Sequence, residues 1–251
     1  MPVLGVIPAR LASTRLHRKP LQPLAGVPLV VRVAERIRTF GVVDTLVVAT
    51  EAAEVADVVR HAGFRVELTS AEHLTGTERV AEVAARPAYA GFDVVVNIQG
   101  DEPFLPRDAI AGALARLRAG DDIGTAAVPL SAEHAGDPGR VKVVTDRHGR
   151  ALYFSRAVIP YLRDAGPVAP AGLYWQHLGL YACGRAALQS WVRHPPTVLE
   201  LAERLEQLRA LQYGLTIGVA HLTTPALPGV DTLDDLRRAE AHWHATPEQP
   251  A

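Results

Sequence analysis

Residues 3–50 read VLGVIPARLASTRLHRKPLQPLAGVPLVVRVAERIRTFGVVDTLVVAT, and this stretch decides the fold. Its first five residues, 3–7, form an apolar run that predicts a buried strand, and the loop after them extends to about Pro28. A helix is expected next, because apolar side chains recur at helical spacing, at Val30, Val33, Ala34 and Ile37. Residues 45–49 predict the second strand, so the chain opens as a strand, a long loop, a helix and a strand.

The same alternation continues through the first half of the chain. We predict further strands at residues 64–68, 94–98 and 123–128, with helices between them. Strands that alternate with helices predict an α/β fold whose sheet is mostly parallel and Rossmann-like, flanked by helices. In such sheets ligands bind beyond the carboxyl ends of the strands, so the loops after Ile7 and Ile98 open on the binding edge.

The second half of the sequence is less regular. Residues 141–144 and 151–154 predict a hairpin across an Asp-Arg-His-Gly turn. Residues 177–183 predict a strand, residues 197–213 a helix, and residues 216–220 a last strand before a terminal helix.

No internal repeat or low-complexity linker divides the chain. We therefore predict a single domain over residues 1–251, with a smaller inserted substrate lobe at about residues 130–215. Residues 160–176 are rich in Pro, Gly and Ala and are expected to be mobile, and residues 244–251 are expected to form a disordered tail.

Composition limits the possible functions. The chain has 251 residues, of which 48% are hydrophobic and 21% charged, which is ordinary for a soluble globular protein. A formal net charge of -1 argues against a nucleic-acid-binding protein. The one cysteine, Cys183, excludes an internal disulfide framework and fits a reducing compartment. No apolar run could span a bilayer and no signal peptide is recognisable, so we expect a cytoplasmic protein without a membrane partner.

The loop after the first strand is strongly basic. No Asp or Glu occurs before Glu35, yet one short stretch carries four cations, Arg10, Arg15, Arg18 and Lys19. Together with the hydroxyl groups of Ser13 and Thr14, these donors suit a triphosphate whose charge moves onto a leaving group. The Gly-Lys-Ser/Thr ending of a Walker loop is missing. The alternative interpretation is a solvated basic loop.

Acidic residues follow the strand predicted at 94–98. Asp101 and Glu102 follow it after Gln99 and Gly100, and a carboxylate at a strand end can bind Mg²⁺ together with phosphate oxygens and water. The alternative is a turn that caps the next helix. Asp231 lies in an Asp-rich stretch, residues 229–235, whose simplest interpretation is a capped helix N-terminus.

Three further patterns are compatible with binding or with structure alone. Residues 75–79, TGTER, open a helix and could offer N–H groups to an anion or merely cap it. His177 and Tyr181 share one face of a strand, although a strand histidine is more often structural. Glu200, Glu203 and Gln207 share one face of the last pattern, a predicted helix. Arginines nearby could form ion pairs with the two acids, as on an ordinary salt-bridged surface.

Eight segments together match the motifs of one known family, in the family's order and over nearly the whole chain. They are VIPARLASTRLHRKPL (6–21), HLTGTERVAEV (73–83), VVVNIQGDEPFLP (94–106), RVKVVTD (140–146), ALYFSRAVIP (151–160), HLGLYA (177–182), LELAERLEQLRAL (199–211) and GVDTLDDL (229–236). The chain resembles the 3-deoxy-manno-octulosonate (KDO) cytidylyltransferases, also called CMP-KDO synthetases. PAR…STR…K and QGDEP are shared with other sugar nucleotidyltransferases, whereas LYFSRA, HLGLY and LEQLR are more particular to the KDO enzymes.

The resemblance implies the nucleotide-diphospho-sugar transferase type of fold and assigns roles to individual residues. The residues that match nucleotide-binding positions are Pro8, Ala9, Arg10, Ser13, Lys19, Gly76, Thr77, Arg79 and Gln99. Those that match the acid-sugar side are Arg15, Gln99, Arg156, His177, Tyr181, Glu206 and Gln207. Asp101 and Asp231 match two acids that coordinate Mg²⁺, and the implied catalytic residues are Lys19, Arg10 and Asp101.

The implied reaction joins CMP from CTP to KDO and releases pyrophosphate, with Mg²⁺ as the cofactor. The C2 hydroxyl of the sugar acid would attack the α-phosphorus in line, while Lys19 and Arg10 neutralise the leaving group. The resemblance also implies a role in lipopolysaccharide biosynthesis. It implies that the protein forms a homodimer and binds CTP and the acidic sugar.

Some positions depart from the family pattern. His17 and Arg18 replace a frequent Pro-Gly pair, Glu51 stands where many members have Asp, and Cys183-Gly184 stands near the sugar side. Another ulosonic acid, such as 8-amino-KDO or sialic acid, therefore stays an alternative substrate, as does a UTP- or dTTP-dependent reaction. A dehydrogenase would need GxGxxG after its first strand, which this chain lacks. A non-catalytic nucleotide-binding module is the alternative from outside the enzymes.

Overall fold

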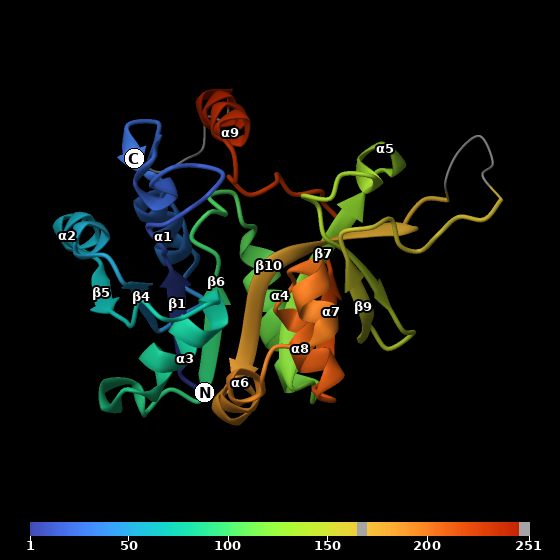
Figure 1. The fold of residues 1–251 in the computed structure, drawn as a ribbon, viewed down its shortest axis with the longest axis horizontal. Helices are drawn as coiled ribbons and strands as arrows, with labels where there is room; N and C mark the ends of the chain where they lie inside the picture. Colours follow the sequence, from blue (N-terminus) through green and yellow to red (C-terminus); the bar gives the residue numbers. More distant parts are fainter. Residues whose placement is uncertain (165–169, 246–251) are drawn as a thin grey trace. The chain divides into compact units, whose positions relative to one another are not determined.

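The computed structural model describes residues 1–164 and 170–245 (Figure 1). The chain divides into two compact units. The first unit contains residues 1–92, 97–105 and the chain from residue 227 onward, and the second contains residues 93–96 and 106–226. Each unit is therefore assembled from segments that are distant in the sequence.

The first unit is built on parallel strands, β1 (Val3–Pro8), β4 (Thr45–Thr50) and β5 (Arg65–Leu68). β1 pairs in parallel with β4, and β4 with β5. The unit also contains the end of β6 (Val94–Ile98), which gives the strand order β6-β1-β4-β5. Leu4, Val6 and Ile7 are fully buried, as expected for a strand covered on both faces.

Four helices belong to the first unit: α1 (Leu29–Phe40), α2 (Ala53–His61), α3 (Gly76–Ala85) and α9 (Leu233–Ala245). α3 packs against β1, and α2 packs against β5. α1 ends at Gly41, whose φ of 61° is the left-handed conformation that glycine adopts at helix ends. α3 begins with a capping box in which Thr75 and Glu78 exchange hydrogen bonds with each other's main chain.

The long loop predicted after β1 contains short regular pieces. They are one 3₁₀ turn, η1 (Lys19–Leu21), and two short strands, β2 (Pro23–Leu24) and β3 (Val27–Pro28). Outside this loop, a second 3₁₀ turn, η2 (Pro87–Tyr89), follows α3. β2 and β3 pair in antiparallel fashion, so the part of the loop without regular structure is confined to residues 9–18.

The second unit has strands β7 (Ile123–Leu130), β8 (Lys142–Thr145), β9 (Ala151–Ser155), β10 (Tyr174–Gly184) and β11 (Ile217–His221). With the start of β6 the strand order is β11-β7-β10-β6. β11 pairs in parallel with β7, whereas β10 is antiparallel to it. The predicted hairpin is confirmed, because β8 and β9 pair in antiparallel fashion.

The helices of the second unit are α4 (Arg107–Arg118), α5 (Ala132–Ala135), α6 (Arg185–Arg193), α7 (Val198–Glu203) and α8 (Gln207–Gln212). α4 packs against β7, β10 and β11, and α8 packs against β9. The prediction of one continuous helix over residues 197–213 is wrong, because Arg204 adopts a left-handed conformation, φ 53°, between α7 and α8.

A buried ion pair explains this break. Arg209 donates to both carboxylate oxygens of Glu200, at 2.8 and 2.6 Å, and both side chains are buried. Residues nine apart on a straight α-helix lie on opposite faces and about 13 Å apart along the axis. The turn at Arg204 therefore brings the two charges together.

The predicted α/β fold, with a mostly parallel sheet flanked by helices, is confirmed. The single domain with a lobe at residues 130–215 stays a prediction. The tail predicted at 244–251 falls largely on residues 246–251, outside the described residues, as do residues 165–169 of the segment expected to be mobile. Among the described residues, no helix combines the length and the apolar character needed to cross a bilayer.

Candidate functional site

A cavity of about 1070 Å³ lies in the first unit, among the segments that follow its strands. Its wall consists of the loop after β1, the residues after β4 and β6, the start of α3 and Asp231. This agrees with the general rule that ligands of α/β sheets bind beyond the carboxyl ends of the strands. A volume of this size accommodates a ligand as large as a nucleotide.

The main chain of the loop after β1 lies close to the segments around it in the cavity wall. The Ala9 N–H donates to the Ala49 carbonyl at 2.8 Å, which extends the pairing of β1 with β4. A Cβ atom on Gly100 would stand 3.0 Å from the Pro8 carbonyl oxygen, and one on Gly76 would stand 3.3 Å from Pro8 Cγ. Glycine at both positions lets the loops after β1 and β6 and the start of α3 come together.

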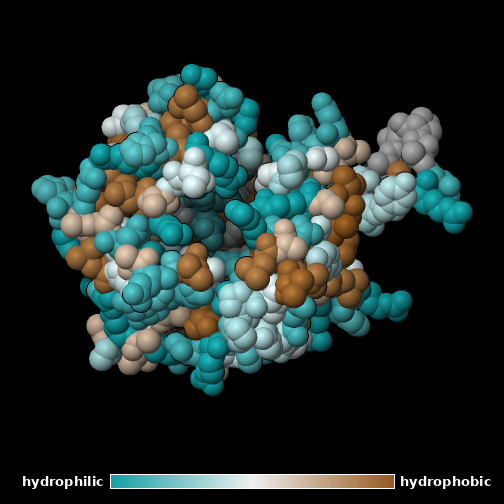
Figure 2. Space-filling model, in the orientation of Figure 1, coloured by the Kyte–Doolittle hydropathy of each residue, from teal (hydrophilic) through white to brown (hydrophobic). Residues whose placement is uncertain are grey.

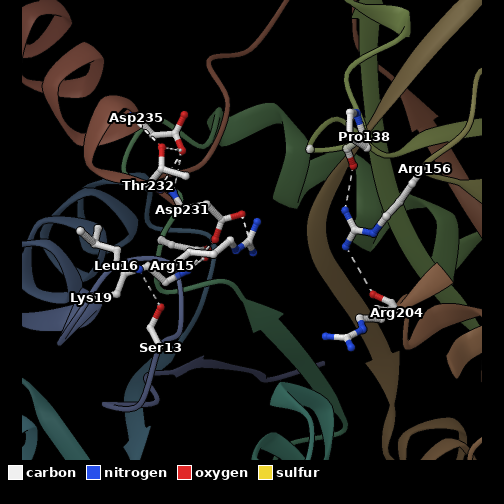
Figure 3. Close-up of polar contacts among 12 residues, drawn as sticks. Ser13, Arg15, Leu16, Lys19, Pro138, Arg156, Arg204, Asp231, Thr232 and Asp235 are labelled. Carbon is white, nitrogen blue, oxygen red and sulfur yellow. Dashed lines mark hydrogen bonds and ion pairs between the residues drawn. The ribbon is translucent and has the colours of Figure 1, made fainter. Parts of the chain in front are cut away.

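Two carboxylates and two cations that line the cavity converge, and Figure 3 shows Arg15, Lys19 and Asp231 of this group. Lys19 Nζ lies 2.5 Å from Asp101 Oδ2 and 2.9 Å from Asp231 Oδ1. Arg15 Nη2 lies 2.9 Å from the other oxygen of Asp231. The main chain holds the two acids side by side, because the Val230 N–H donates to the Asp101 carbonyl at 2.8 Å.

The electrostatics of this cluster favour charged groups. Burial opposes the ammonium form of Lys19, but attraction by Asp101 and Asp231 outweighs burial and raises the pKa of Lys19 above its ordinary value. Lys19 is therefore a permanent cation at neutral pH.

Asp231 is not the residue that caps α9. Asp235 Oδ2 accepts the N–H groups of Asp231 and Thr232, at 3.2 and 2.8 Å, and Thr232 Oγ1 accepts the Asp235 N–H. Thr232 and Asp235 satisfy the helix N-terminus. The predicted capped helix N-terminus within residues 229–235 is therefore confirmed, but its cap is formed by Thr232 and Asp235, and the Asp231 carboxylate faces Lys19 and Arg15 instead.

The donor set fits a magnesium ion. Within the described chain, no cluster of three or more His, Cys, Asp or Glu side chains could hold a metal by itself. Mg²⁺ typically binds one or two protein carboxylates and completes its shell with phosphate oxygens and water. Asp101 and Asp231, which approach the same ammonium group, meet that description.

The segment that opens α3 contributes less side-chain surface than predicted. Of the nine residues expected to bind nucleotide, all except Thr77 line the cavity. Thr77 is buried and its Oγ1 accepts from Asn97 Nδ2 at 3.1 Å, so this side chain points to the interior. Arg79 lines the cavity but is only 2% exposed, and it is held by Glu51, Thr69 and the Ser70 carbonyl.

Sequence reasoning missed several lining residues, among them Glu51, His73 and Leu74. Glu51 was noted only as a departure from the family pattern. Its place directly after a parallel strand is the signal that could have identified it, because that is where ligand-facing residues gather.

In the second unit, main-chain carbonyls hold the side chain of Arg156 (Figure 3). Its guanidinium donates to the carbonyls of Glu203 at 2.8 Å, Pro138 at 2.8 Å and Arg204 at 3.4 Å. The Arg156 N–H donates to the Glu203 carboxylate at 2.9 Å. These hydrogen bonds orient the guanidinium without neutralising its charge, because the side chain is bonded to neutral carbonyls.

His177 is a buried, neutral imidazole. Its Nε2 lies 2.9 Å from Thr125 Oγ1, and its ring lies edge-on to Phe154, with centroids 4.8 Å apart. Burial lowers the pKa of His177 to about 3, so the ring carries no charge at neutral pH. This histidine can position a ligand or a neighbour through hydrogen bonds, but it is not suited to general acid-base catalysis near pH 7.

The other residues of the second unit that are predicted to bind the sugar lie on β10, at Tyr181, and at the start of α8, at Glu206 and Gln207. His177 and Tyr181 have ring centroids 5.5 Å apart, which confirms that they share one face of β10. Tyr181 contacts Trp191 edge-on at 5.1 Å, and Trp191 Nε1 donates to the Glu206 carbonyl at 3.1 Å. Gln207, at the start of α8, is buried at 2% exposure. Of the other predicted sugar-side residues, Arg15 and Gln99 line the cavity of the first unit.

The chain is similar to known proteins over almost its whole length. A family model described as Cytidylyltransferase matches residues 4–217. A 3-deoxy-manno-octulosonate cytidylyltransferase from Gemmatimonas aurantiaca is 56% identical over 97% of this chain and 95% of its own length. One of the same description from Wolinella succinogenes is 44% identical over 93% of this chain and 96% of its own length.

Solved structures show the same fold. A CMP:2-keto-3-deoxy-manno-octonic acid synthetase complexed with CTP superposes with a TM-score of 0.88 at 34% identity, covering 98% of this chain and 99% of that one. A glucose-1-phosphate thymidylyltransferase described as putative, from Bacillus anthracis, has a TM-score of 0.68 at 15% identity, covering 99% and 98% of the two chains, which supports the fold alone. The chain therefore belongs to the cytidylyltransferase family.

Proposed function

We propose that this enzyme transfers CMP from CTP to 3-deoxy-D-manno-octulosonate, forming CMP-KDO and pyrophosphate. The observation that carries the proposal is the convergence of Lys19 and Arg15 with the carboxylates of Asp101 and Asp231 in a cavity beside a basic loop. The similarity to relatives described as 3-deoxy-manno-octulosonate cytidylyltransferases supports the choice of nucleotide and sugar.

The cavity of the first unit would hold the nucleotide. Proposed contacts come from the loop after β1, from the start of α3 and from the end of β6: Pro8, Ala9, Arg10, Ser13, Lys19, Gly76, Thr77, Arg79 and Gln99. Because the side chain of Thr77 faces the interior, its contribution would come through its main chain at the N-terminus of α3.

Asp101 and Asp231 would hold Mg²⁺. When bound there, the ion would supply positive charge to the phosphate oxygens during the displacement. Lys19, which contacts both acids, stands where its ammonium can also follow charge onto the departing pyrophosphate, and Arg10 would assist it. The sugar's C2 oxygen would form the new bond to the α-phosphorus and lose its proton to solvent, as the bond from the α-phosphorus to the oxygen bridging to the β-phosphate breaks and pyrophosphate leaves.

The acid sugar would be recognised by Arg15, Gln99, Arg156, His177, Tyr181, Glu206 and Gln207. Arg156 is oriented by carbonyls and keeps its charge, so it suits a carboxylate that it can bind in a bidentate manner. His177, buried and neutral, would contribute position rather than proton transfer.

We further propose a homodimer that acts in the cytoplasm, in the activation of a sugar for lipopolysaccharide. Figure 2 shows apolar side chains gathered on the surface over α7. Val198 and Leu201 of α7 are 80% and 65% exposed, and Leu152 of β9 is 63% exposed. Apolar surface of this kind commonly marks a protein interface.

Pyrophosphate release tests the proposed function directly. Purified protein with Mg²⁺, CTP and KDO should release pyrophosphate, and EDTA should stop the release. UTP and ATP in place of CTP, and sialic acid or 8-amino-KDO in place of KDO, serve as parallel reactions. Release with another acid sugar alone would keep the reaction class and replace the substrate, whereas no release with any pair would favour a nucleotide-binding module.

A further inference from the structure

Glu51 joins two parts of the nucleotide cavity that are distant in the sequence. Its Oε1 accepts the N–H of Leu11, in the loop after β1, at 2.9 Å. Its Oε2 lies 3.0 Å from Nη2 of Arg79, on α3. One carboxylate therefore contacts both the basic loop and the helix that borders the same cavity.

The helix end of this bridge is rigid. Arg79 is 2% exposed, and its other terminal nitrogen donates to Thr69 Oγ1 and to the Ser70 carbonyl, the latter at 3.2 Å. Burial lowers the pKa of Arg79, and the nearby Glu51 carboxylate opposes that change. A buried guanidinium needs such a partner, since an unpaired buried charge is strongly destabilising.

The loop end of the bridge extends the strand pairing of the first unit. The Ala9 N–H donates to the carbonyl of Ala49, and two residues later the Leu11 N–H donates to the side chain of Glu51. The spacing of two residues is that of a parallel ladder, with a carboxylate in place of the next main-chain carbonyl. Arg10 lies between these two anchored N–H groups.

We propose that Glu51 is a positioning residue that fixes the main chain around Arg10 and so shapes the nucleotide-binding loop. The expected effect of Glu51 on the kinetics rests on the proposed function. The contacts of Glu51 with Leu11 and Arg79 exist in the protein without any ligand. Residues 9–18 have no regular structure, so an anchor at Leu11 has a large effect on how far the loop can move.

Two substitutions separate the two ends of the bridge. Glu51→Ala removes both contacts. Glu51→Gln keeps one oxygen that can accept the Leu11 N–H, but its NH₂ group then faces the Arg79 guanidinium, donor against donor. The glutamine can therefore satisfy the loop or the arginine, and its effect should lie between those of wild type and Glu51→Ala. Glu35→Gln, which alters a partly buried i,i+3 pair with Arg32 outside the cavity lining, is the matched control.

Hydrogen-deuterium exchange of the ligand-free protein tests the anchor. Exchange over residues 9–19 should accelerate about tenfold in Glu51→Ala and less in Glu51→Gln, and this acceleration should exceed any over residues 45–50 and 80–85, where the loss of the charge partner of Arg79 acts. The control should exchange like wild type. Unchanged exchange over residues 9–19 in both Glu51 variants would overturn the proposal, as would equal acceleration over all three segments, which would mean that Glu51 merely stabilises the unit.

Steady-state pyrophosphate release gives the second readout. Loss of a preformed loop weakens ground state and transition state together, so KM for CTP should rise about tenfold in Glu51→Ala while kcat changes less than about threefold. An unchanged KM for CTP would also overturn the proposal. If wild type releases no pyrophosphate, the proposed function fails, and the exchange measurement still decides whether Glu51 anchors the loop.

Discussion

At the scale of single residues, the cluster around Lys19 makes the sharpest prediction. Replacing Asp101 with Asn removes one of two carboxylates that are proposed to hold Mg²⁺, and it leaves Asp231 in contact with Lys19. We expect kcat/KM to fall by a factor of about 10³ or more, because charge stabilisation at a phosphoryl transfer site contributes several kcal/mol. Pyrophosphate release as a function of CTP concentration, repeated at several Mg²⁺ concentrations, measures the loss.

The neighbouring Asp234→Asn is the control for this substitution. Asp234 lies at the start of α9, three residues after Asp231, but its side chain is 73% exposed and pairs with Arg237. It should retain wild-type kinetics. Both variants should keep the wild-type thermal midpoint, and an Asp101→Asn enzyme with normal turnover would remove Asp101 from the proposed metal site.

His177 predicts how stability changes with pH. Its folded pKa is about 3, below the ordinary value of 6.5, because burial disfavours the charged ring. The stability that depends on a neutral His177 is therefore complete above pH 6.5 and is lost as pH falls toward 3. The slope is at most about 1.4 kcal/mol per pH unit, since the unfolded chain binds the proton that the folded one refuses.

Urea unfolding at several pH values checks this sign. His177→Gln should flatten the loss of stability between pH 6.5 and 4, after the other titrating groups have been accounted for by comparison with wild type. His134→Gln, which changes an exposed histidine of the same unit, should leave the slope as it is. A steeper slope in His177→Gln would mean that the buried ring is charged in the folded protein.

At the scale of elements, the pair of Glu200 with Arg209 determines how α7 and α8 are arranged. Glu200→Gln leaves a buried guanidinium without its charged partner and should lower the free energy of unfolding by about 3–5 kcal/mol. Asp57→Asn, which alters an exposed i,i+3 pair with Arg60, should cost less than about 1 kcal/mol. Replacing both partners, Glu200→Leu with Arg209→Met, should recover most of the loss, because two apolar side chains need no charge partner. Equal stability of Glu200→Gln and wild type would show that the pair does not hold the turn.

The same elements show what can be predicted from the sequence. Strands β1, β4 and β6 and helix α1 follow from local apolar periodicity, which depends only on neighbouring residues. The break at Arg204 could not be predicted, because the apolar pattern of residues 197–213 continues through the turn. The break depends instead on an ion pair between two residues that are nine positions apart.

The site divides in the same way. Asp101 could be predicted because it follows a strand, and the cations of the loop because they are concentrated in one stretch. The inward side chain of Thr77 and the bridging role of Glu51 could not, since each depends on a partner twenty or more residues away. Local pattern therefore predicts which segments reach the cavity, and long-range contacts decide which atoms of those segments face it.

At the scale of the whole molecule, the exposed apolar side chains of α7 carry the last prediction. Val198 and Leu201 are exposed on α7, whereas Glu200 of the same helix is buried, so one face of α7 points inward and the other is open to solvent. If α7 meets a second copy of the chain, wild type should sediment as a species of twice 26.9 kDa at micromolar concentration. Leu201→Asp places a charge in that interface and should shift the species to the monomer mass, because an unpaired charge is costly to bury. Leu233→Asp, at a leucine of the first unit that is 50% exposed, should leave the dimer intact. A wild-type monomer at these concentrations would contradict the prediction of a dimer. Dissociation by both substitutions alike would contradict the prediction that the apolar side chains of α7 form the dimer interface.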